Sequence, residues 1–579
     1  MIKIENLSYS YPQKELYDNI SFTIEEGNHC AFLGSSGSGK STLVDMIMNP
    51  DNYLYDGKIE IEPTCRIGYV SQFSNLSNES DFTVFQYIGE QFIKYQKEIE
   101  AICSKMETAT ELETLLEQFQ DTMDAYNAIG GDAYESNIKK KLKLANLDKL
   151  EEQLVSKLSG GEFKLIQVIK EMLTEPDLII MDEPDVFLDF ENLNALKDLI
   201  NSHKGAIIII THNRYLLNHC FNKILHLENK ELQEFEGRYI DYNFKLLQTK
   251  VELQELYVAD SEEIARNEQI IERLRKIASN DAEAARGKSL YARIKIQERL
   301  EARRIKAPFV DIKIPEIHFN NDTVLEESIA LKVEDYGVSF DELLLEHVNF
   351  EVISNEKVAI IGPNGTGKTT LLRDIYKNNN SAISIQEDIN VAFLSQNISE
   401  VLDESVTIMD YFLDMGFKTY TEVINYLEPY GFTEEVLNQK IGDLSGGEKN
   451  ILQLAKISAS NVNFLLLDEP TSHLDTYAQV ALENAIKEYK GGVLMVSHDF
   501  YTIANCVDYV LLIEDKSIRK LSIRKFRKMI YEKHFNKEYL EIEQKKKAVE
   551  EQIELALKET NFEKAKVLVD ELENYINLL

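Results

Sequence analysis

Three features are scarce in this chain of 579 residues: long apolar runs, cysteine and positive charge. No apolar run approaches the roughly 18 residues of a membrane-spanning helix, and the aliphatic stretch 206–210 reads as a buried strand. The five cysteines form neither a C-x-x-C pair nor a metal-ligand spacing, which indicates thiols in a reducing compartment. A net charge of −36 argues against a protein that binds nucleic acid or anionic membrane over its whole surface. Because the first residues also alternate like a strand and lack the apolar core of a signal peptide, we expect a cytoplasmic protein of several domains.

Glycine, in contrast, is clustered in a stretch that occurs twice. Each copy satisfies G-x-x-x-x-G-K-[ST], follows an apolar strand (30–33 or 358–361) and opens a helix. That context is what a phosphate-binding loop requires, because backbone N–H groups and the helix N-terminus then face an anion. The two copies consist of Gly34, Ser35, Ser36, Gly37, Ser38, Gly39, Lys40, Ser41 and Thr42, and of Gly362, Pro363, Asn364, Gly365, Thr366, Gly367, Lys368, Thr369 and Thr370. We therefore predict that the protein binds two nucleoside triphosphates; the alternative is a glycine-rich turn that binds nothing.

The same series of motifs follows each loop in the same order. A strand ends on glutamine, a Leu-Ser-Gly-Gly-Glu signature precedes a helix, a strand ends in Asp-Glu, and a further strand precedes a histidine. The first series is Gln72, Ser159, Gly160, Gly161, Glu162, Asp182, Glu183 and His212, and the second is Gln396, Ser445, Gly446, Gly447, Glu448, Asp468, Glu469 and His498. From the signature onward the two series differ by 286 positions, whereas the glutamines differ by 324, so the first repeat holds 38 extra residues between glutamine and signature. Such an internal repeat indicates a duplicated domain.

These paired motifs resemble those of the ABC-type ATPases, with two cassettes in one polypeptide and no membrane domain. More narrowly, the chain is similar to the ABC-F family of soluble translation factors and ribosome-protection proteins. The narrower resemblance depends on the sequence DEPTSHLD at 468–475, on Ser-His-Asp at 497–499 and on a charged helical linker between the cassettes. The resemblance covers nearly the whole chain. It implies an α/β fold with two P-loop ABC-type nucleotide-binding domains in tandem, a long α-helical hairpin linker and a C-terminal helical extension.

The expected domains follow from these positions. Cassette one is predicted at 1–236, with a polar, mostly helical insertion at about 82–157. The linker is predicted at 237–328, cassette two at 329–528, and a C-terminal helical hairpin at 529–579.

The family resemblance also implies that the signature of one cassette completes the ATP site of the other. Site one would combine the phosphate loop, glutamine, Asp-Glu pair and histidine of cassette one with the signature residues 445–448. Site two would combine their counterparts in cassette two with the signature residues 159–162. ATP and Mg²⁺ are the implied cofactors, and hydrolysis of ATP is the implied reaction.

Each residue type has a chemical reason to be in these sites. The lysines Lys40 and Lys368 would reach the β- and γ-phosphates. A glutamate directly after the metal-binding aspartate can polarise the attacking water, and a histidine can hydrogen-bond the γ-phosphate and so sense its presence. The expected metal ligands are Ser41, Gln72 and Asp182 in site one and Thr369, Gln396 and Asp468 in site two. The expected catalytic residues are Glu183, His212, Glu469 and His498.

Two details of the sites differ between the copies or depend on weak signals. Cassette one has DEPDVFLD at 182–189, where the family usually shows threonine and histidine after the proline, and this puts equal rates at the two sites in doubt. For stacking on adenine we suggest Tyr11 and Phe340, aromatic residues that lie just over twenty positions before the phosphate loops. A structural role in the core is the alternative for both aromatic residues.

The linker carries the strongest functional signal outside the ATP sites. Its pattern predicts a long charged helix, a break at 279–281 and a second helix to about Lys306, as in an antiparallel helical hairpin. From Arg286 to Lys306 there are eight basic residues and two acidic ones, in a protein whose net charge is −36. Such a basic rod can neutralise phosphates, although a solvated helix face is the usual explanation of a charge run. The family resemblance favours contact with ribosomal RNA and P-site transfer RNA near the peptidyl-transferase centre.

Three questions stay open at this stage. The C-terminal hairpin, with Thr560 and Asn561 between its helices, could touch ribosomal RNA or pack on cassette two. Within the ribosomal interpretation, antibiotic protection competes with a general or regulatory role in translation, and the short linker tip slightly disfavours direct displacement of a drug.

The alternatives from other classes are the ATP-binding subunit of a membrane transporter and a DNA-repair ATPase, the latter disfavoured because long coiled coils and zinc motifs are absent. We expect a monomer whose cassettes pair with each other.

Overall fold

The computed structural model describes residues 1–11, 14–72, 81–107, 112–186, 188–280, 293–297, 314–320, 327–340, 343–534 and 539–579. The chain divides into two compact units. The core unit contains both cassettes and consists of Met1–Glu236 and Lys313–Lys528. The linker unit consists of Gly237–Ile312 and Met529–Leu579. Among the described helices, none is both long enough and apolar enough to cross a membrane.

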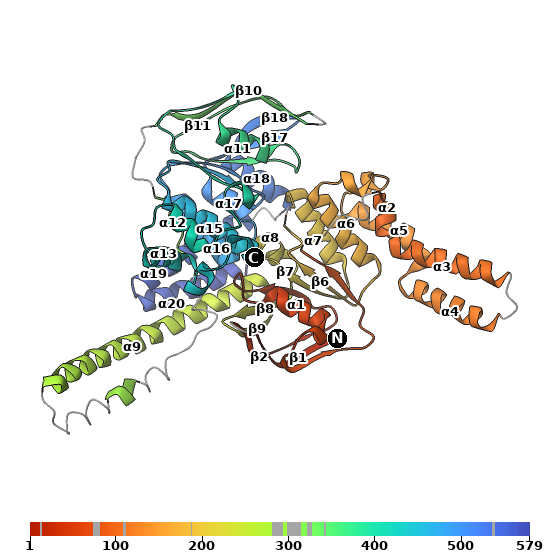
Figure 1. The fold of residues 1–579 in the computed structure, drawn as a ribbon, viewed down its shortest axis with the longest axis horizontal. Helices are drawn as coiled ribbons and strands as arrows, with labels where there is room; N and C mark the ends of the chain where they lie inside the picture. Colours follow the sequence, from red (N-terminus) through yellow and green to blue (C-terminus); the bar gives the residue numbers. More distant parts are fainter. Residues whose placement is uncertain are drawn as a thin grey trace. The chain divides into compact units, whose positions relative to one another are not determined.

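Each cassette is built on a six-stranded sheet whose first five strands run parallel (Figure 1). In cassette one the order is β5 (Ile67–Val70), β6 (Leu178–Asp182), β7 (Ala206–Ile210), β3 (His29–Leu33), β8 (Lys223–Glu228) and the antiparallel β9 (Glu231–Glu236). In cassette two it is β14 (Val391–Leu394), β15 (Phe464–Asp468), β16 (Gly492–Val496), β12 (Lys357–Ile361), β17 (Tyr509–Glu514) and the antiparallel β18 (Ser517–Ser522). The central strands β6, β7, β15 and β16 are buried at every residue, which is why their sequences are continuous apolar runs rather than alternating ones.

A second, antiparallel sheet of three strands belongs to each cassette. The orders are β2 (Lys14–Ile24), β1 (Ile2–Tyr11) and β4 (Asp56–Ile61) in cassette one, and β11 (Leu343–Ile353), β10 (Ile329–Ser339) and β13 (Ile383–Ile385) in cassette two. The helix after the phosphate loop, α1 (Lys40–Met48), contributes Leu43 and Ile47 to a core that also contains Ile4 of β1 and Ile180 of β6. In cassette two α11 (Lys368–Lys377) lies in an equivalent core. The phosphate loop is therefore held by packing on both sheets.

The remaining cassette helices place the other motifs. The signatures precede α6 (Gly160–Leu173) and α15 (Gly446–Ala459), and the Asp-Glu motifs lead into α7 (Phe190–Ser202) and α16 (Thr476–Glu488). The histidines precede α8 (Arg214–His219) and α17 (Phe500–Cys506). Cassette two further contains α12 (Ile408–Asp414), α13 (Tyr420–Leu427), α14 (Glu434–Leu437) and α18 (Ile523–His534).

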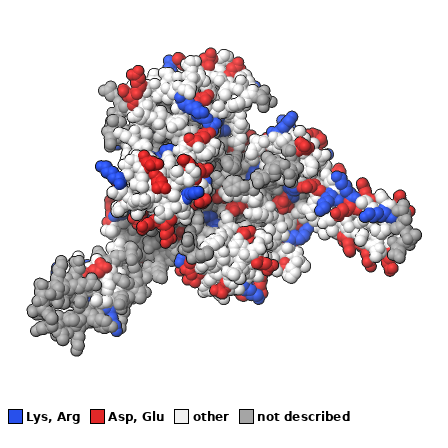
Figure 2. Space-filling model, in the orientation of Figure 1, with Lys and Arg blue, Asp and Glu red and all other residues white. Residues whose placement is uncertain are grey.

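The segment of cassette one between Gln72 and its signature, which is longer than that of cassette two, is mostly helical. Its helices are α2 (Val84–Ile88), α3 (Glu90–Met106), α4 (Glu113–Ala128) and α5 (Tyr134–Leu144). The long helices α3 and α4 lie side by side, and side chains of both charge signs cover the face that Figure 2 shows. Their fully buried residues are confined to one end: Phe92 stacks on Tyr134 with ring centroids 4.9 Å apart, and the hydroxyl of the buried Tyr126 donates to the carbonyl of Gly131.

The linker unit joins two segments that the sequence analysis treated as separate. Helix α9 (Tyr239–Asn280) packs through Val251 against α19 (Tyr539–Lys558) and α20 (Phe562–Ile576), and Lys250 pairs with Glu554 at 2.8 Å. Asn561 caps α20 by accepting from the backbone N–H of Lys564, in agreement with the predicted turn. The C-terminal hairpin thus packs on the linker helix, a contact that was absent from both options considered for it. The two segments lie nearly 300 positions apart (250 and 554), so no local pattern signals their pairing.

A short part of the second linker helix is also described. Residues 293–297 are helical, and the amide of the buried Asn267 in α9 donates to the side-chain carbonyl of Gln297 at 2.7 Å. This contact brings the short helical segment beside α9. Of the eight basic residues between Arg286 and Lys306, only Arg293 and Lys295 lie within the described residues.

Candidate functional site

Both phosphate loops have the conformation that their glycines permit. Gly37 and Gly39 have φ of 73° and 102°, values that L side chains rarely adopt. The amino group of Lys40, buried under the loop, donates to the carbonyls of Gly34 and Ser35 at 2.8 and 2.9 Å. Lys368 makes the equivalent bonds to Gly362 and Pro363 at 2.8 and 2.7 Å. In each loop a buried cation thus lies beneath a glycine-rich turn that precedes a helix, an arrangement typical of a loop that binds phosphate.

The first loop has a support that sequence reasoning missed. The hydroxyl of Tyr17, a fully buried residue of β2, donates to the carbonyl of Gly39 at 2.5 Å. The position 328 residues later, which matches the offset between the loops, is Leu345, and its side chain lies beside Gly367. Only a comparison of aligned copies combined with the fold could have identified this difference.

This difference yields a first prediction. The substitution Tyr17→Phe is expected to weaken ATP binding at site one about fivefold, because the loss of one hydrogen bond costs about 1 kcal/mol. ATP titration of the full chain, with Lys368→Ala to disable site two, measures the change. The matched control is Tyr126→Phe, which removes a buried hydroxyl that donates to Gly131 at 2.7 Å in the insertion. Equal affinities for Tyr17→Phe and this control would show that the bond does not support the loop.

The aspartates that end β6 and β15 lie beneath the phosphate loops. Both are buried, and Asp468 accepts from the hydroxyl of Thr369 at 3.1 Å through Oδ1. Its other oxygen, Oδ2, is buried and has no hydrogen-bond partner in the described structure. Burial raises the pKa of Asp468 to about 6. A buried carboxylate oxygen beside a threonine hydroxyl and a lysine fits a divalent cation, so these residues are suited to hold Mg²⁺.

The glutamate that follows each aspartate has an unusual backbone conformation. Glu183 and Glu469 have φ of 44° and 49°, in the left-handed region, and each backbone N–H donates to the carbonyl that ends the neighbouring strand (Ile210 and Val496, both at 2.9 Å). Strained backbone in matching positions of both copies is typical of functional residues. The strain turns these side chains toward the cavities that the sites occupy.

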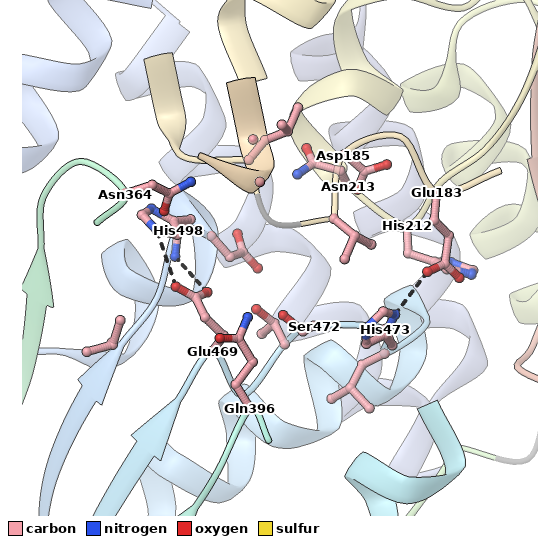
Figure 3. A pocket seen from close by; sticks show the side chains of 18 of the residues that line it. Glu183, Asp185, His212, Asn213, Asn364, Gln396, Glu469, Ser472, His473 and His498 are labelled. Carbon is pink, nitrogen blue, oxygen red and sulfur yellow. Dashed lines mark hydrogen bonds and ion pairs between the residues drawn. The ribbon is translucent and has the colours of Figure 1, made fainter. Parts of the chain in front are cut away.

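The two glutamates differ in their partners. Glu183 accepts from Gln72 at 2.6 Å and lies 3.0 Å from Nδ1 of His473, which belongs to the other cassette (Figure 3). Burial alone would raise the pKa of Glu183, but His473 outweighs it and holds the pKa below its usual value. Glu469 accepts from the backbone N–H of His498 at 3.1 Å, and burial together with the charge of Asp468 raises its pKa to about 8.

The sequence difference noted at 182–189 concerns this contact. By the 286-residue offset the counterpart of His473 is Phe187, which lies outside the described residues. A phenylalanine cannot hydrogen-bond a carboxylate, so the residue that matches His473 cannot pair with Glu469 as His473 pairs with Glu183. The histidine beside Glu469 is His498 of its own cassette. The two sites therefore differ chemically at the residue expected to act on water.

The two cassettes contribute jointly to each cavity. The site-one cavity, of about 720 Å³, is lined by Tyr11, Lys40, Gln72, Glu183 and His212 of cassette one and by residues 444–447 of cassette two. The site-two cavity, of about 370 Å³, is lined by Lys368, Thr369, Gln396, Glu469 and His498 and by Gly160 and Gly161 of cassette one. Of the two suggested adenine-stacking residues, Tyr11 thus lines its cavity. The side chain of Phe340 is 70% exposed, and Phe340 is absent from the described lining of site two.

The signature and one aspartate of each cassette lie near the phosphate loop of the other cassette. Ser159 and Ser445 cap their helices together with Glu162 and Glu448, so their hydroxyls stay at the helix N-termini. The hydroxyl of Ser445 lies 3.4 Å from that of Ser36. Beyond the signatures, Asp475 accepts from the N–H of Ser36 at 3.2 Å, and Asp189 accepts from the N–H of Asn364 at 3.1 Å. Neither aspartate was assigned a role from the sequence; these contacts show where both lie.

The histidines lie deep in the sites. His498 Nε2 is 3.4 Å from Glu469 Oε1, and His212 lines both cavities. Burial lowers the pKa of His212 to about 4 and that of His498 to about 3. Both imidazoles are consequently neutral at pH 7 and can donate one hydrogen bond and accept another.

Comparison with known proteins agrees with this architecture. The family model described as "ABC transporter" matches residues 17–186 and 345–472. The chain is 29% identical over 516 residues to the uncharacterized ABC transporter ATP-binding protein YfmM of Bacillus subtilis, covering 86% of this chain and 96% of that protein. It is 28% identical over 531 residues to ABC transporter F family member 5 of Arabidopsis thaliana (89% and 75% covered). It is 29% identical over 521 residues to the energy-dependent translational throttle protein EttA of Escherichia coli (87% and 90% covered).

Solved structures show the same fold. The archaeal ribosome recycling factor aABCE1, in complex with the stalk protein aP1, aligns with a TM-score of 0.50 at 17% identity, covering 91% of this chain and 92% of that one. The RNase-L inhibitor aligns with a TM-score of 0.51 at 18% identity, covering 91% and 93%. The predicted fold class, two P-loop cassettes of the ABC type in tandem, is confirmed.

Proposed function

Because this chain belongs to the ABC transporter family and carries two of its ATPase cassettes in tandem, we propose that it is an ABC-F type ATPase that works on the ribosome. The chain hydrolyses ATP, as its ABC ATPase domains indicate. We assign the linker to the P-site transfer RNA and the peptidyl-transferase centre, where ATP-driven closure of the cassettes would act. The single observation that carries the proposal is that each cassette contacts the phosphate loop of the other, and that His473 of cassette two contacts Glu183 of cassette one. Nucleotide binding and cassette pairing would then depend on each other.

Two further observations support a ribosomal partner. Relatives that match over most of the chain include a translational throttle protein and members of the plant ABC F family. The linker also concentrates eight basic residues between Arg286 and Lys306, whereas the whole chain has a net charge of −36. A local basic stretch in an acidic protein suits one defined contact with RNA phosphates and disfavours coating of RNA by the whole surface. A ribosomal partner also implies work in the cytoplasm.

At the sites, the side chains have distinct tasks in hydrolysis. Lys40 and Lys368 would neutralise phosphate charge, and Asp182 and Asp468 would hold the metal together with the hydroxyls of Ser41 and Thr369. A bound Mg²⁺ would supply neutralisation of the nucleotide's charge. Glu183 and Glu469 orient and polarise the attacking water, while Gln72 and Gln396 connect the metal side of the site to that water.

The remaining residues of the proposed machinery report the state of the nucleotide. Neutral His212 and His498 can donate a hydrogen bond to the γ-phosphate, which is lost after hydrolysis. The signatures at 159–162 and 445–448 present backbone N–H groups and a serine hydroxyl from the opposite cassette. Hydrolysis at either site therefore removes contacts that hold the cassettes together, and release from the ribosome would follow.

Within this function we propose modulation of translation through the P-site transfer RNA, with antibiotic protection as the second form of the same activity. Protection acting through the transfer RNA needs no contact with the drug and so is compatible with the short linker tip that the sequence predicts. Growth of a deletion strain with and without ribosome-targeting antibiotics separates the two forms.

The test uses the double variant Glu183→Gln, Glu469→Gln, which keeps the binding groups but loses the carboxylates that act on water. We expect it to sediment with ribosomes in the presence of ATP, and less so as salt is raised, because phosphate contacts release counterions. The control variant Lys40→Ala, Lys368→Ala, which cannot hold the phosphates, is expected to stay at the top of the gradient with ATP present. If the double glutamine variant also stays there, the ribosomal proposal is wrong, and its recovery with membranes would favour a transporter subunit instead.

A further inference from the structure

Arg214 makes an ion pair from one cassette to the other outside both sets of predicted site residues. It is the first residue of α8 and lies two positions after His212. Its Nη2 donates to Glu483 at 2.5 Å, to Asp499 at 2.8 Å and to the hydroxyl of Thr502 at 3.2 Å, all in cassette two. The side chain of Arg214 is 14% exposed and that of Glu483 is 4% exposed, so water screens this pair little.

The acceptors of Arg214 belong to elements that also contribute to site two and to the contact between the cassettes. Asp499 directly follows His498; its Oδ1 caps α17 by accepting from the N–H of Tyr501, while its Oδ2 receives Arg214. Glu483 lies on α16, whose capping residue Asp475 contacts the phosphate loop of cassette one. The guanidinium also lies over the ring of Tyr501, 4.9 Å from its centroid. Arg214 therefore joins the loop of one expected γ-phosphate sensor to the loop of the other.

The arrangement is present on one side only. With the offset of 286 residues, the counterparts of Arg214, Asp499 and Glu483 are Phe500, Asn213 and Lys197. None of these could form the mirror ion pair, and Phe500 instead packs on Phe526 of its own cassette with centroids 5.8 Å apart. All three members of the mirror cluster are replaced together, whereas the phosphate loops, the Asp-Glu pairs and the histidines occur in both copies.

Charge makes the cluster sensitive to the relative position of the two loops. One guanidinium pairs with the carboxylates of Glu483 (4% exposed) and Asp499 (17% exposed), and separation would leave those two negative charges together in a poorly solvated place. Burial alone would raise the pKa of Asp499, but Arg214 outweighs it and holds the pKa below its usual value. A displacement of the loop that carries His212 is thus transmitted to the loop that carries His498. Figure 3 shows His212 and Asn213 of the first loop and His498 of the second around the same cavity.

We propose that Arg214 is a positioning residue that couples the two ATP sites, through its ion pair with Asp499 and Glu483. This inference deepens the proposed function and depends on the assignment of the two ATP sites, not on the ribosome. The test therefore contains no ribosomes, so a failed ribosomal proposal leaves its outcome unchanged.

The experiment is a double-mutant cycle on the purified full chain. Steady-state ATP hydrolysis is measured for Glu183→Gln, which leaves turnover to site two, and the KM and kcat for ATP are compared with and without Arg214→Met. With Arg214 present, the KM of site two is expected to change about fivefold or more according to whether site one can hydrolyse ATP, because coupled sites alter each other's affinity. With Arg214→Met, the change is expected to fall below about twofold, and Arg214→Lys, which keeps the charge, is expected to restore part of it.

Two further variants separate coupling from folding. Asp499→Asn removes the charge but keeps the helix cap, because Asn213 makes the same cap in cassette one by accepting from the N–H groups of Tyr215 and Leu216. It should abolish coupling as Arg214→Met does. Arg66→Met is the matched control: Arg66 donates to the carbonyls of Ala128, Thr174 and Glu175 within cassette one, so its loss should leave coupling intact.

The proposal has clear contrary results. Undiminished coupling in Asp499→Asn would overturn it, even if Arg214→Met fails to fold. The proposal would equally be overturned by variants that slow both sites by the same factor and leave the coupling unchanged, because the ion pair would then only hold the cassettes together.

Discussion

Replacing Glu183 and Glu469 together by glutamine is expected to lower the steady-state rate of ATP hydrolysis about a hundredfold or more while ATP binding persists. An amide cannot take a proton from water, and loss of a positioned general base removes about two to four orders of magnitude in rate. Both side chains lie at the ends of buried strands and line the cavities with the phosphate loops, so glutamine fits the same space. Phosphate release and binding of a fluorescent ATP analogue are the two measurements.

The single variants show how the sites share turnover. Because Glu183 contacts Gln72 and His473 whereas the counterpart of His473 is Phe187, we expect Glu183→Gln to remove the larger part of the rate. Glu171→Gln is the control, since this half-buried glutamate of α6 lines neither of the two ATP cavities described. A double variant that keeps most of the wild-type rate would show that other groups activate the water.

The substitution Ile553→Ala is expected to destabilise the linker unit by about 3 kcal/mol, as is typical when a fully buried isoleucine leaves a cavity. Ile553 is 0% exposed and lies in the core that α19 and α20 form with Val251 of α9. Because a chain of several domains does not unfold in one step, hydrogen exchange resolved by peptide is the suitable measurement. Peptides of α9, α19 and α20 should exchange more than about tenfold faster, and those of the cassettes should stay unchanged.

The matched control for this prediction is Val567→Ala on α20. The side chain of Val567 is 67% exposed, so its truncation should change stability by less than about 0.5 kcal/mol. Unchanged exchange in α9 for Ile553→Ala would show that the C-terminal hairpin does not support the linker helix. If exchange does rise there, the same variant allows a test of whether the hairpin is needed for the proposed ribosomal contact.

Much of the core unit was predictable because the informative residues are contiguous. The phosphate loops, the signatures and the Asp-Glu pairs each encode a local backbone shape: a glycine-rich turn, a capped helix start or the end of a buried strand. Order and spacing of these motifs identified two copies of one fold, which the family match and the solved structures confirm. The helical insertion and the turn at Asn561 were likewise visible in local patterns.

The residues by themselves thus determined that this chain has two ABC cassettes, a charged linker and a helical tail. They also determined which side chains are candidates to bind phosphate, to hold the metal and to act on water. Only the tertiary structure decided which of them meet: His473 with Glu183, Arg214 with Asp499, Tyr17 with Gly39, and the tail with α9. These contacts join elements far apart in the chain or side chains of ordinary type, so no local period or motif marks them. They depend on which buried surfaces and charges meet once the chain is folded. These contacts make the two ATP sites different from each other.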